Sequence, residues 1–161
     1  MAKKKRPMPG KAIAQNRRGR RDYSIIETFE AGIILTGTEV KALRGGRASI
    51  NETFADDKND ELWLYNLHIP VYENAGKHLN HSPIRPRKLL LHRRQLSHLH
   101  GSIKRKGMTL IPLSLYFNDR GIVKIQLALG QGKRMVDKRE DVKRRDWQRD
   151  KARLMRNKGI Q

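Results

Sequence analysis

The sequence contains no cysteine, which excludes a disulfide framework, a thiolate metal site and a cysteine nucleophile. It also lacks any apolar run approaching the roughly 20 residues that a transmembrane helix requires. The N-terminus lacks the apolar region of a signal peptide. From these absences we expect a cytoplasmic protein with no membrane partner.

Positive charge is in excess, and most of it lies near the two ends of the chain. The 36 Lys and Arg against 16 Asp and Glu give a net charge of +20, with +9 in residues 1–21, +7 in residues 132–161 and only +4 between them. We therefore expect a flexible basic arm over 1–21, a folded domain over 22–131 and a basic tail over 132–161. This distribution is typical of nucleic-acid binders, although RNA, DNA or an acidic protein would each fit it. The basic run from Lys3 to Arg6 also resembles a nuclear import signal.

The tail has the periodicity of a helix but too few apolar side chains to fold alone. Trp147, Lys151, Leu154 and Met155 fall at i, i+4, i+7 and i+8, on one helical face. An isolated helix of this kind is marginal in water. We expect a tail that is disordered alone and becomes helical on a polyanionic partner. A solvated tail without a partner and an amphipathic membrane helix are the alternatives.

The middle of the chain has the alternation of short antiparallel strands. The clearest run, residues 23–31, alternates at period two, and Gly32 then predicts a bulge or bend. The other expected strands are residues 49–55, 61–69, 88–91, 109–117 and 122–129. Pro112 cannot donate a ladder hydrogen bond, so its strand is expected to be bulged or at an edge. Without alternating strands and helices, the pattern favours an antiparallel barrel.

Two short helices are expected within this barrel. Residues 37–46 have Thr38 as the N-cap, with Val40 and Leu43 facing inward. Residues 92–104 form the second, with apolar residues at helical spacing. Between them residues 70–86 form a long loop of the kind that is usually functional. Arg85, Arg87 and Lys88 at its end are candidate phosphate contacts.

Two kinds of cluster could hold a metal ion. They are the histidine pairs His78 and His81, and His98 and His100, and the acidic group Asp56, Asp57 and Asp60. The acidic group would suit a nuclease, but clustered Asp between two strands is also what a turn needs, and we assign it to the turn over 56–60. The histidines lack cysteine or acidic partners nearby, which favours structural or RNA-contacting roles. We therefore expect no metal and no cofactor.

Several blocks, in order along the chain, resemble one known family. They are EAG at 30–32, GTEVKALRGG at 37–46, RPRKLLLH at 85–92, LIPLSLYF at 110–117 and GKRMVDKRE at 132–140. In these blocks the chain closely resembles the bacterial SsrA-binding proteins, also called small protein B, over residues 16–155.

The resemblance implies a mainly β fold: an oligonucleotide-binding (OB)-fold-like antiparallel barrel with two or three short helices. It implies a barrel that holds the tRNA-like domain of transfer-messenger RNA, and a tail that enters the decoding site and empty mRNA channel of a stalled ribosome. The protein would then be a monomeric adaptor of trans-translation and not an enzyme. Elongation factor Tu and alanyl-tRNA synthetase would be indirect partners through the RNA. A structural ribosomal protein and an RNA enzyme are the competing hypotheses.

The resemblance also assigns roles to individual residues. Glu30, Leu90 and His92 match the family's contact surface for transfer-messenger RNA, although on its own Glu30 could be a plain strand-face acid and Leu90 a core residue. The tail residues fall into two groups. Lys133, Arg134, Asp137, Lys138 and Arg139 match the part that meets the decoding centre, and Trp147, Lys151, Leu154 and Met155 the part that lines the mRNA channel.

Overall fold

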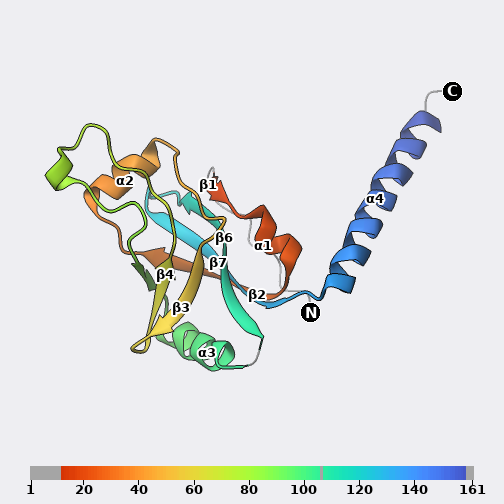
Figure 1. The fold of residues 1–161 in the computed structure, drawn as a ribbon, viewed down its shortest axis with the longest axis horizontal. Helices are drawn as coiled ribbons and strands as arrows, with labels where there is room; N and C mark the ends of the chain where they lie inside the picture. Colours follow the sequence, from red (N-terminus) through yellow and green to blue (C-terminus); the bar gives the residue numbers. More distant parts are fainter. Residues whose placement is uncertain (1–11, 106, 159–161) are drawn as a thin grey trace.

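A computed structural model describes residues 12–105 and 107–158, and consists of one curled antiparallel sheet with helices around it (Figure 1). The strands are β1 (Ala12–Gln15), β2 (Tyr23–Ile33), β3 (Phe54–Lys58), β4 (Glu61–Tyr65), β5 (Arg87–Leu90), β6 (Met108–Phe117) and β7 (Val123–Gly132). The helices are α1 (Arg17–Asp22), α2 (Gly37–Arg44), the 3-10 helix η1 (Lys77–Leu79), α3 (Arg93–Ile103) and α4 (Met135–Lys158). The prediction of a mainly antiparallel β fold with several helices is confirmed.

The strands pair in the order β1-β6-β3-β4-β5-β2-β7, and β6 also pairs with β7. Six strands, β2 to β7, therefore close a ring of pairings, and β1 adds to the outside of β6. The ring encloses a core of fully buried side chains, among them Leu62, Leu110, Leu115, Ile125 and Leu127. The period-two prediction for β2 is confirmed, because Phe29 and Ala31 are buried while Glu30 between them is exposed.

Residues 12–22 differ from the flexible arm predicted over 1–21, because they form β1 and α1. Ile13 packs against the core, and Ala14 pairs with Leu115 on β6. Asn16 then caps α1, its side-chain oxygen accepting a hydrogen bond from the backbone N–H of Gly19 at 2.9 Å. A strand of four residues and a helix of six are too short to give a sequence pattern. The Lys3–Arg6 run lies outside the described residues.

The hairpin of β3 and β4 turns more tightly than predicted. Asn59 and Asp60 both have left-handed backbones, with φ of 53° and 61°, which is the geometry of a two-residue hairpin turn. Asp56 and Asp57 therefore belong to β3 and not to a turn over 56–60, and β3 begins at Phe54 instead of residue 49.

The strand predicted over 61–69 ends early for a similar reason. β4 stops at Tyr65, and the left-handed Asn66 (φ 60°) reverses the alternation. Unbroken alternation over 61–69 would place Leu67 and Ile69 on the face opposite Leu62, yet after this reversal both are buried, as Leu62 is.

Helix α2 has its N-cap at Thr36, two residues earlier than expected. The backbone N–H of Thr36, not Thr38, closes the first turn by donating to Oε2 of Glu39 at 2.8 Å. The inward face consists of Glu39, Ala42 and Leu43, whereas Val40 is only half-buried. A carboxylate on an inward face was not anticipated, and its partners are described below.

The β6–β7 hairpin agrees with its prediction. The pairing register shifts between Pro112 and Ser114, which is the bulge expected at that proline. Asn118 accepts hydrogen bonds from the backbone N–H groups of Arg120 and Ile122, and Gly121 has φ of 72°. β6 is buried on both faces. β1 pairs along its edge, and α1 packs against it.

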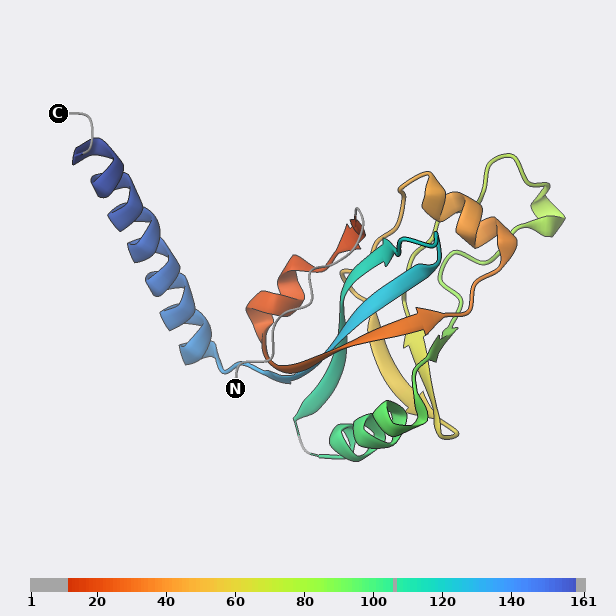
Figure 2. The same cartoon turned by 180° about the vertical axis from the view of Figure 1, so that it is seen from behind.

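Helix α4 leaves the body of the protein as a single rod (Figure 1 and, from behind, Figure 2). It follows β7 after only two residues, so its starting point is fixed by the sheet. None of the helices in the described part of the chain is both long and apolar enough to span a membrane.

Candidate nucleic-acid interface

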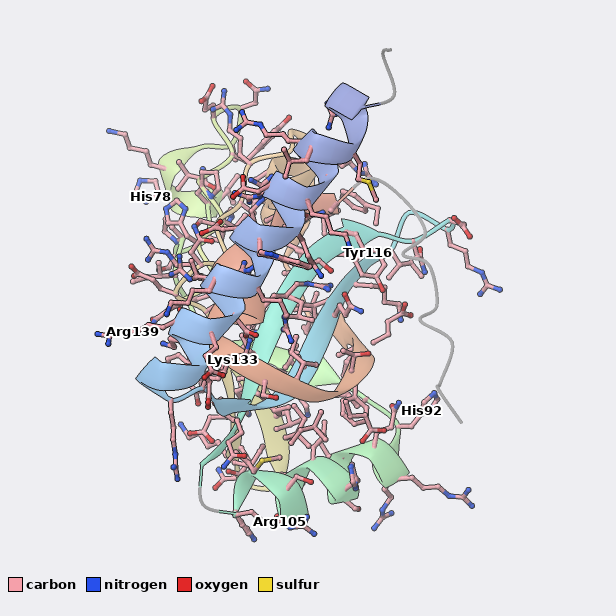
Figure 3. The ribbon with its side chains drawn as sticks, turned by 90° about the vertical axis from the view of Figure 1, so that its right-hand side faces the viewer. His78, His92, Arg105, Tyr116, Lys133 and Arg139 are labelled. Carbon is pink, nitrogen blue, oxygen red and sulfur yellow. The ribbon has the colours of Figure 1, made fainter. Side chains whose placement is uncertain are left out.

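Glu30 and Leu90 lie on one outward face at the junction of β2 and β5. Leu90 pairs with Gly32, and Glu30 is two residues before Gly32 on the same side of β2. A Cβ at Gly32 would lie 3.3 Å from Cβ of Leu90, so the two strands approach closely here. Leu90 is 50% exposed, which rules out the core interpretation of this leucine. His92 follows, exposed, at the N-cap of α3 (Figure 3).

Glu30 is held in place by Tyr116. The phenol of Tyr116 donates a hydrogen bond to Oε2 of Glu30 at 2.5 Å, across the intervening strand β7. Tyr116 is only 3% exposed. Burial raises the pKa of the Tyr116 phenol, and the hydrogen bond and negative charge of Glu30 raise the pKa further. The phenol therefore remains a donor over the whole physiological range and fixes one carboxylate oxygen of Glu30, so that the other can meet a ligand.

Replacing Tyr116 with Phe is expected to lower the free energy of unfolding by about 1–2 kcal/mol, because it removes a hydrogen bond to an ionised group. Urea unfolding measures this loss. In an alkaline absorbance titration, the wild type should contain one tyrosine that ionises far later than the others, and the variant should lack it. A wild type in which no tyrosine ionises late would mean that the Tyr116 phenol is neither buried nor bonded to Glu30 in solution.

Arg85 and Arg87, both predicted to contact phosphates, donate to the buried carboxylate of Glu39. Arg87 is fully buried and donates to Oε1 of Glu39 at 2.8 Å and to the carbonyls of Leu67 and Pro83. Arg85 donates to both carboxylate oxygens of Glu39, at 2.8 and 2.6 Å. Arg87 thus has no surface to offer a phosphate, and its prediction as a contact is incompatible with this burial.

Lys88 and the four clustered histidines also have internal partners, with one exception. Lys88 pairs with Glu61. The histidine contacts are His81 with Thr38 and the carbonyl of Ile69, His98 with Glu27, and His100 with Asp57, whereas His78 is exposed on η1. Within residues 12–105 and 107–158 no three His, Asp or Glu side chains gather where they could hold a metal ion.

The root of helix α4 is tied to α1 through Asp22. The backbone N–H of Lys133 donates to the carbonyl of Asp22 at 3.0 Å, and Nζ of Lys138 lies 3.7 Å from the Asp22 carboxylate. Nζ of Lys133 also donates a hydrogen bond, at 2.5 Å, to the carboxylate of Asp141, which lies 8 residues further along the chain. Hydrogen bonding to Arg21 lowers the pKa of Asp22, against a smaller opposing effect of burial, and the charge of Lys138 adds to the lowering. These contacts keep the base of the helix at the sheet.

Beyond its root the helix presents its predicted apolar line to solvent. Trp147, Leu154 and Met155 are 63%, 64% and 65% exposed. Nζ of Lys151 lies 5.2 Å above the Trp147 ring, a cation–π contact within the helix. The cationic side chains Arg134 and Arg139 are exposed, as is Asp137, while Lys133 and Lys138 are half-buried against Asp141 and Asp22 (Figure 3). A helix that buries none of its own apolar line is suited to bury it on a partner.

Sequence reasoning missed three residues that organise these surfaces: Asp22, Glu39 and Tyr116. Tyr116 reaches Glu30 only because β6, β7 and β2 are neighbours, which the alternation of single strands cannot reveal. Glu39 did have a signal, because Thr36 and Glu39 fit the spacing of a capping box.

Comparison with known proteins points to one family. The family model described as "SmpB protein" matches residues 13–157. The chain is similar to an "SsrA-binding protein" of Azorhizobium caulinodans, with 56% identity over 98% of both chains. It is also similar to one of Methylorubrum populi, with 57% identity over 94% of this chain and 96% of that protein. A solved structure described as "tmRNA-SmpB: a journey to the center of the bacterial ribosome" matches with a TM-score of 0.63 and 50% identity, covering 80% of this chain and 92% of that one.

Proposed function

Because the chain belongs to the SmpB family, we propose that it binds transfer-messenger RNA and acts with it on stalled ribosomes, as an adaptor of trans-translation. The observation that carries the proposal is the division of the molecule into a folded body with an exposed Glu30–Leu90 face and a separate basic helix. One part can hold an RNA while the other reaches a second binding partner.

The folded body is the part that holds the tRNA-like domain of the RNA. The closed ring of β2 to β7 serves as an OB-type barrel, a fold whose outer face and loops bind oligonucleotides. Leu90 offers an exposed apolar contact beside the fixed carboxylate of Glu30, which accepts hydrogen bonds from 2′-hydroxyl or base N–H groups. His92 extends the face toward α3.

Helix α4 is the part that reads the ribosome. Its first turns, with Lys133, Arg134, Asp137, Lys138 and Arg139, meet the decoding-centre RNA of the small subunit. Further along, Lys151 and the exposed Trp147, Leu154 and Met155 line the empty mRNA channel. A basic helix enters only a channel that mRNA has left vacant, because an occupied channel offers neither the space nor the free phosphates. Beyond the root held at Asp22, this helix is only marginally stable in the free protein and is stabilised on the ribosome, since no other element covers its apolar side chains.

In this role the protein catalyses no covalent step and needs no cofactor. It acts as a monomer in the cytoplasm, and it affects elongation factor Tu and alanyl-tRNA synthetase only through the RNA that they share.

The proposal is tested by the affinity of the full-length protein for transfer-messenger RNA and for bulk tRNA at the same salt concentration. Leu90→Ala is expected to weaken binding to transfer-messenger RNA by about tenfold, the loss of one buried apolar contact. Leu79→Ala is the matched control, because Leu79 is 78% exposed in η1, away from this face. Equal affinity for the two RNAs, or equal effects of the two substitutions, would contradict the proposal.

A further inference from the structure

A cleft of about 370 Å³ lies beside α1, away from the Glu30–Leu90 face, and meets the root of α4 only at Asp22. Residues of α1, of the start of β2, of the segment that leads into β3 and of the start of β6 line it. The lining side chains that matter for binding are Arg18, Tyr23, Asn51, Glu52, Phe54 and Thr109. In the ring of strands β3 stands three places from β2 in either direction, so Phe54 lies across the barrel from Glu30.

Phe54 gives this cleft an exposed aromatic ring. It is 44% exposed although it begins a strand of the ring. It stacks on Tyr65 of β4, with ring centroids 5.3 Å apart and an angle of 21° between the planes. Two stacked rings at the edge of a cleft can be extended by a third planar ring. Nucleobases bind to exposed aromatic side chains in this way in many single-strand binding proteins.

Helix α1 places one arginine, Arg18, in the lining of the cleft and three more arginines outside it on the same short helix. It contains Arg17, Arg18, Arg20 and Arg21, with Asp22 as its one acid. Asp22 is already neutralised by Arg21 and Lys138. The other three arginines are exposed and form no ion pair with any residue in 12–105 or 107–158. Unpaired guanidinium groups at this spacing suit the phosphates of an extended RNA strand.

We propose that the cleft binds one unpaired base of a single-stranded RNA segment, stacked on Phe54, with the flanking phosphates on Arg18 and its neighbours. Asn51 and Glu52 also line the cleft, and their amide and carboxylate groups are of the kind that bonds to the edge of a base. The cleft also includes Asp22, so RNA bound there touches the anchor of α4. The site is independent of the face that holds transfer-messenger RNA, and it can be tested without that RNA.

The test uses the full-length protein and a labelled, unstructured RNA of about ten nucleotides, with a second oligomer of equal length whose riboses carry no bases. Phe54→Leu keeps an apolar side chain against Tyr65 but removes the planar ring. It is expected to weaken binding of the normal oligomer about tenfold, the loss of one stacked base, and to leave binding of the base-free oligomer unchanged. Phe54→Tyr should restore wild-type affinity. The basic helix α4 is present in every sample, so its own phosphate contacts affect all variants equally.

Arg18→Gln supplies a second readout that does not depend on the aromatic ring. It should weaken binding of both oligomers and lower the slope of log affinity against log salt by about 0.7, one phosphate contact with a single strand, whereas Phe54→Leu should leave the slope unchanged. The proposal is overturned if Phe54→Leu weakens both oligomers equally or neither. It is also overturned if an acidic peptide competes for the cleft as well as RNA does, because the site would then bind protein.

Discussion

A chain that ends at Gly132 is expected to bind transfer-messenger RNA within about fivefold of the full-length affinity, because the general electrostatic attraction of the tail is lost but the Glu30–Leu90 face is kept. The same chain should add no peptide tag on stalled ribosomes. β7 remains whole in this truncation, since Gly132 is its last residue and pairs with Tyr23. Filter binding and a tagging reaction on ribosomes stalled at the end of an mRNA measure the two activities side by side.

A charge-matched variant separates the shape of the helix from its charge. Trp147→Ala, Leu154→Ala and Met155→Ala together leave every Lys and Arg in place and remove the exposed apolar line. Tagging is expected to fall by at least about tenfold, because burial of even one apolar side chain contributes that much to binding. RNA binding is expected to stay unchanged. If the chain that ends at Gly132 lost RNA binding and tagging equally, the tail would itself contribute to binding of transfer-messenger RNA. Wild-type tagging by the triple variant would mean that charge alone suffices.

How much of this fold was predictable depended on how local each feature is. The alternation around Phe29 and the bulge at Pro112 follow from residues next to one another in sequence, and both predictions are confirmed. β1 was missed because it forms by pairing with β6, about a hundred residues further along the chain. A pattern of neighbouring residues cannot reveal such a distant pairing. The reversal at Asn66 was missed because a single left-handed residue changes which face every later side chain takes.

In the candidate site, too, local features could be predicted from the sequence, whereas contacts between distant elements could not. The exposure of Trp147, Leu154 and Met155 could be predicted from the sequence. These residues recur at helical spacing in a segment that is too polar to pack against the core. The basic residues around Pro86 had no such pattern, and charge alone cannot distinguish a phosphate contact from a structural cation. Arg87 has become structural because Glu39 enters the core from a different element, α2. A pairing between distant elements of this kind appears only in the folded chain.

The second large effect is expected at Glu39. Replacing Glu39 with Ala should lower the free energy of unfolding by about 3–5 kcal/mol, because Arg87 would be left as a buried charge without its partner. That loss is a large part of the total stability of a small domain, about 5–15 kcal/mol. Urea unfolding measures it, and Glu39→Gln, which keeps the volume and an acceptor, provides a folded variant for comparison. Glu61→Ala is the matched control. Its pair with Lys88 is partly exposed, so we expect a loss below about 1 kcal/mol.

The pH dependence gives an independent check on the same cluster. Burial by itself raises the pKa of Glu39, but hydrogen bonds from Arg85 and the Thr36 backbone, with the charge of Arg87, lower it below the ordinary value of 4.5. A group whose pKa is lower in the folded state stabilises the fold fully above its unfolded pKa, and that contribution is lost as the pH falls. Stability of the wild type should therefore decline below about pH 4.5 more steeply than that of Glu39→Gln. If the two proteins lost stability equally as the pH fell, the carboxylate would carry no charge in the fold. Arg87 would then be satisfied by the backbone carbonyls of Leu67, Pro83 and Arg85 alone.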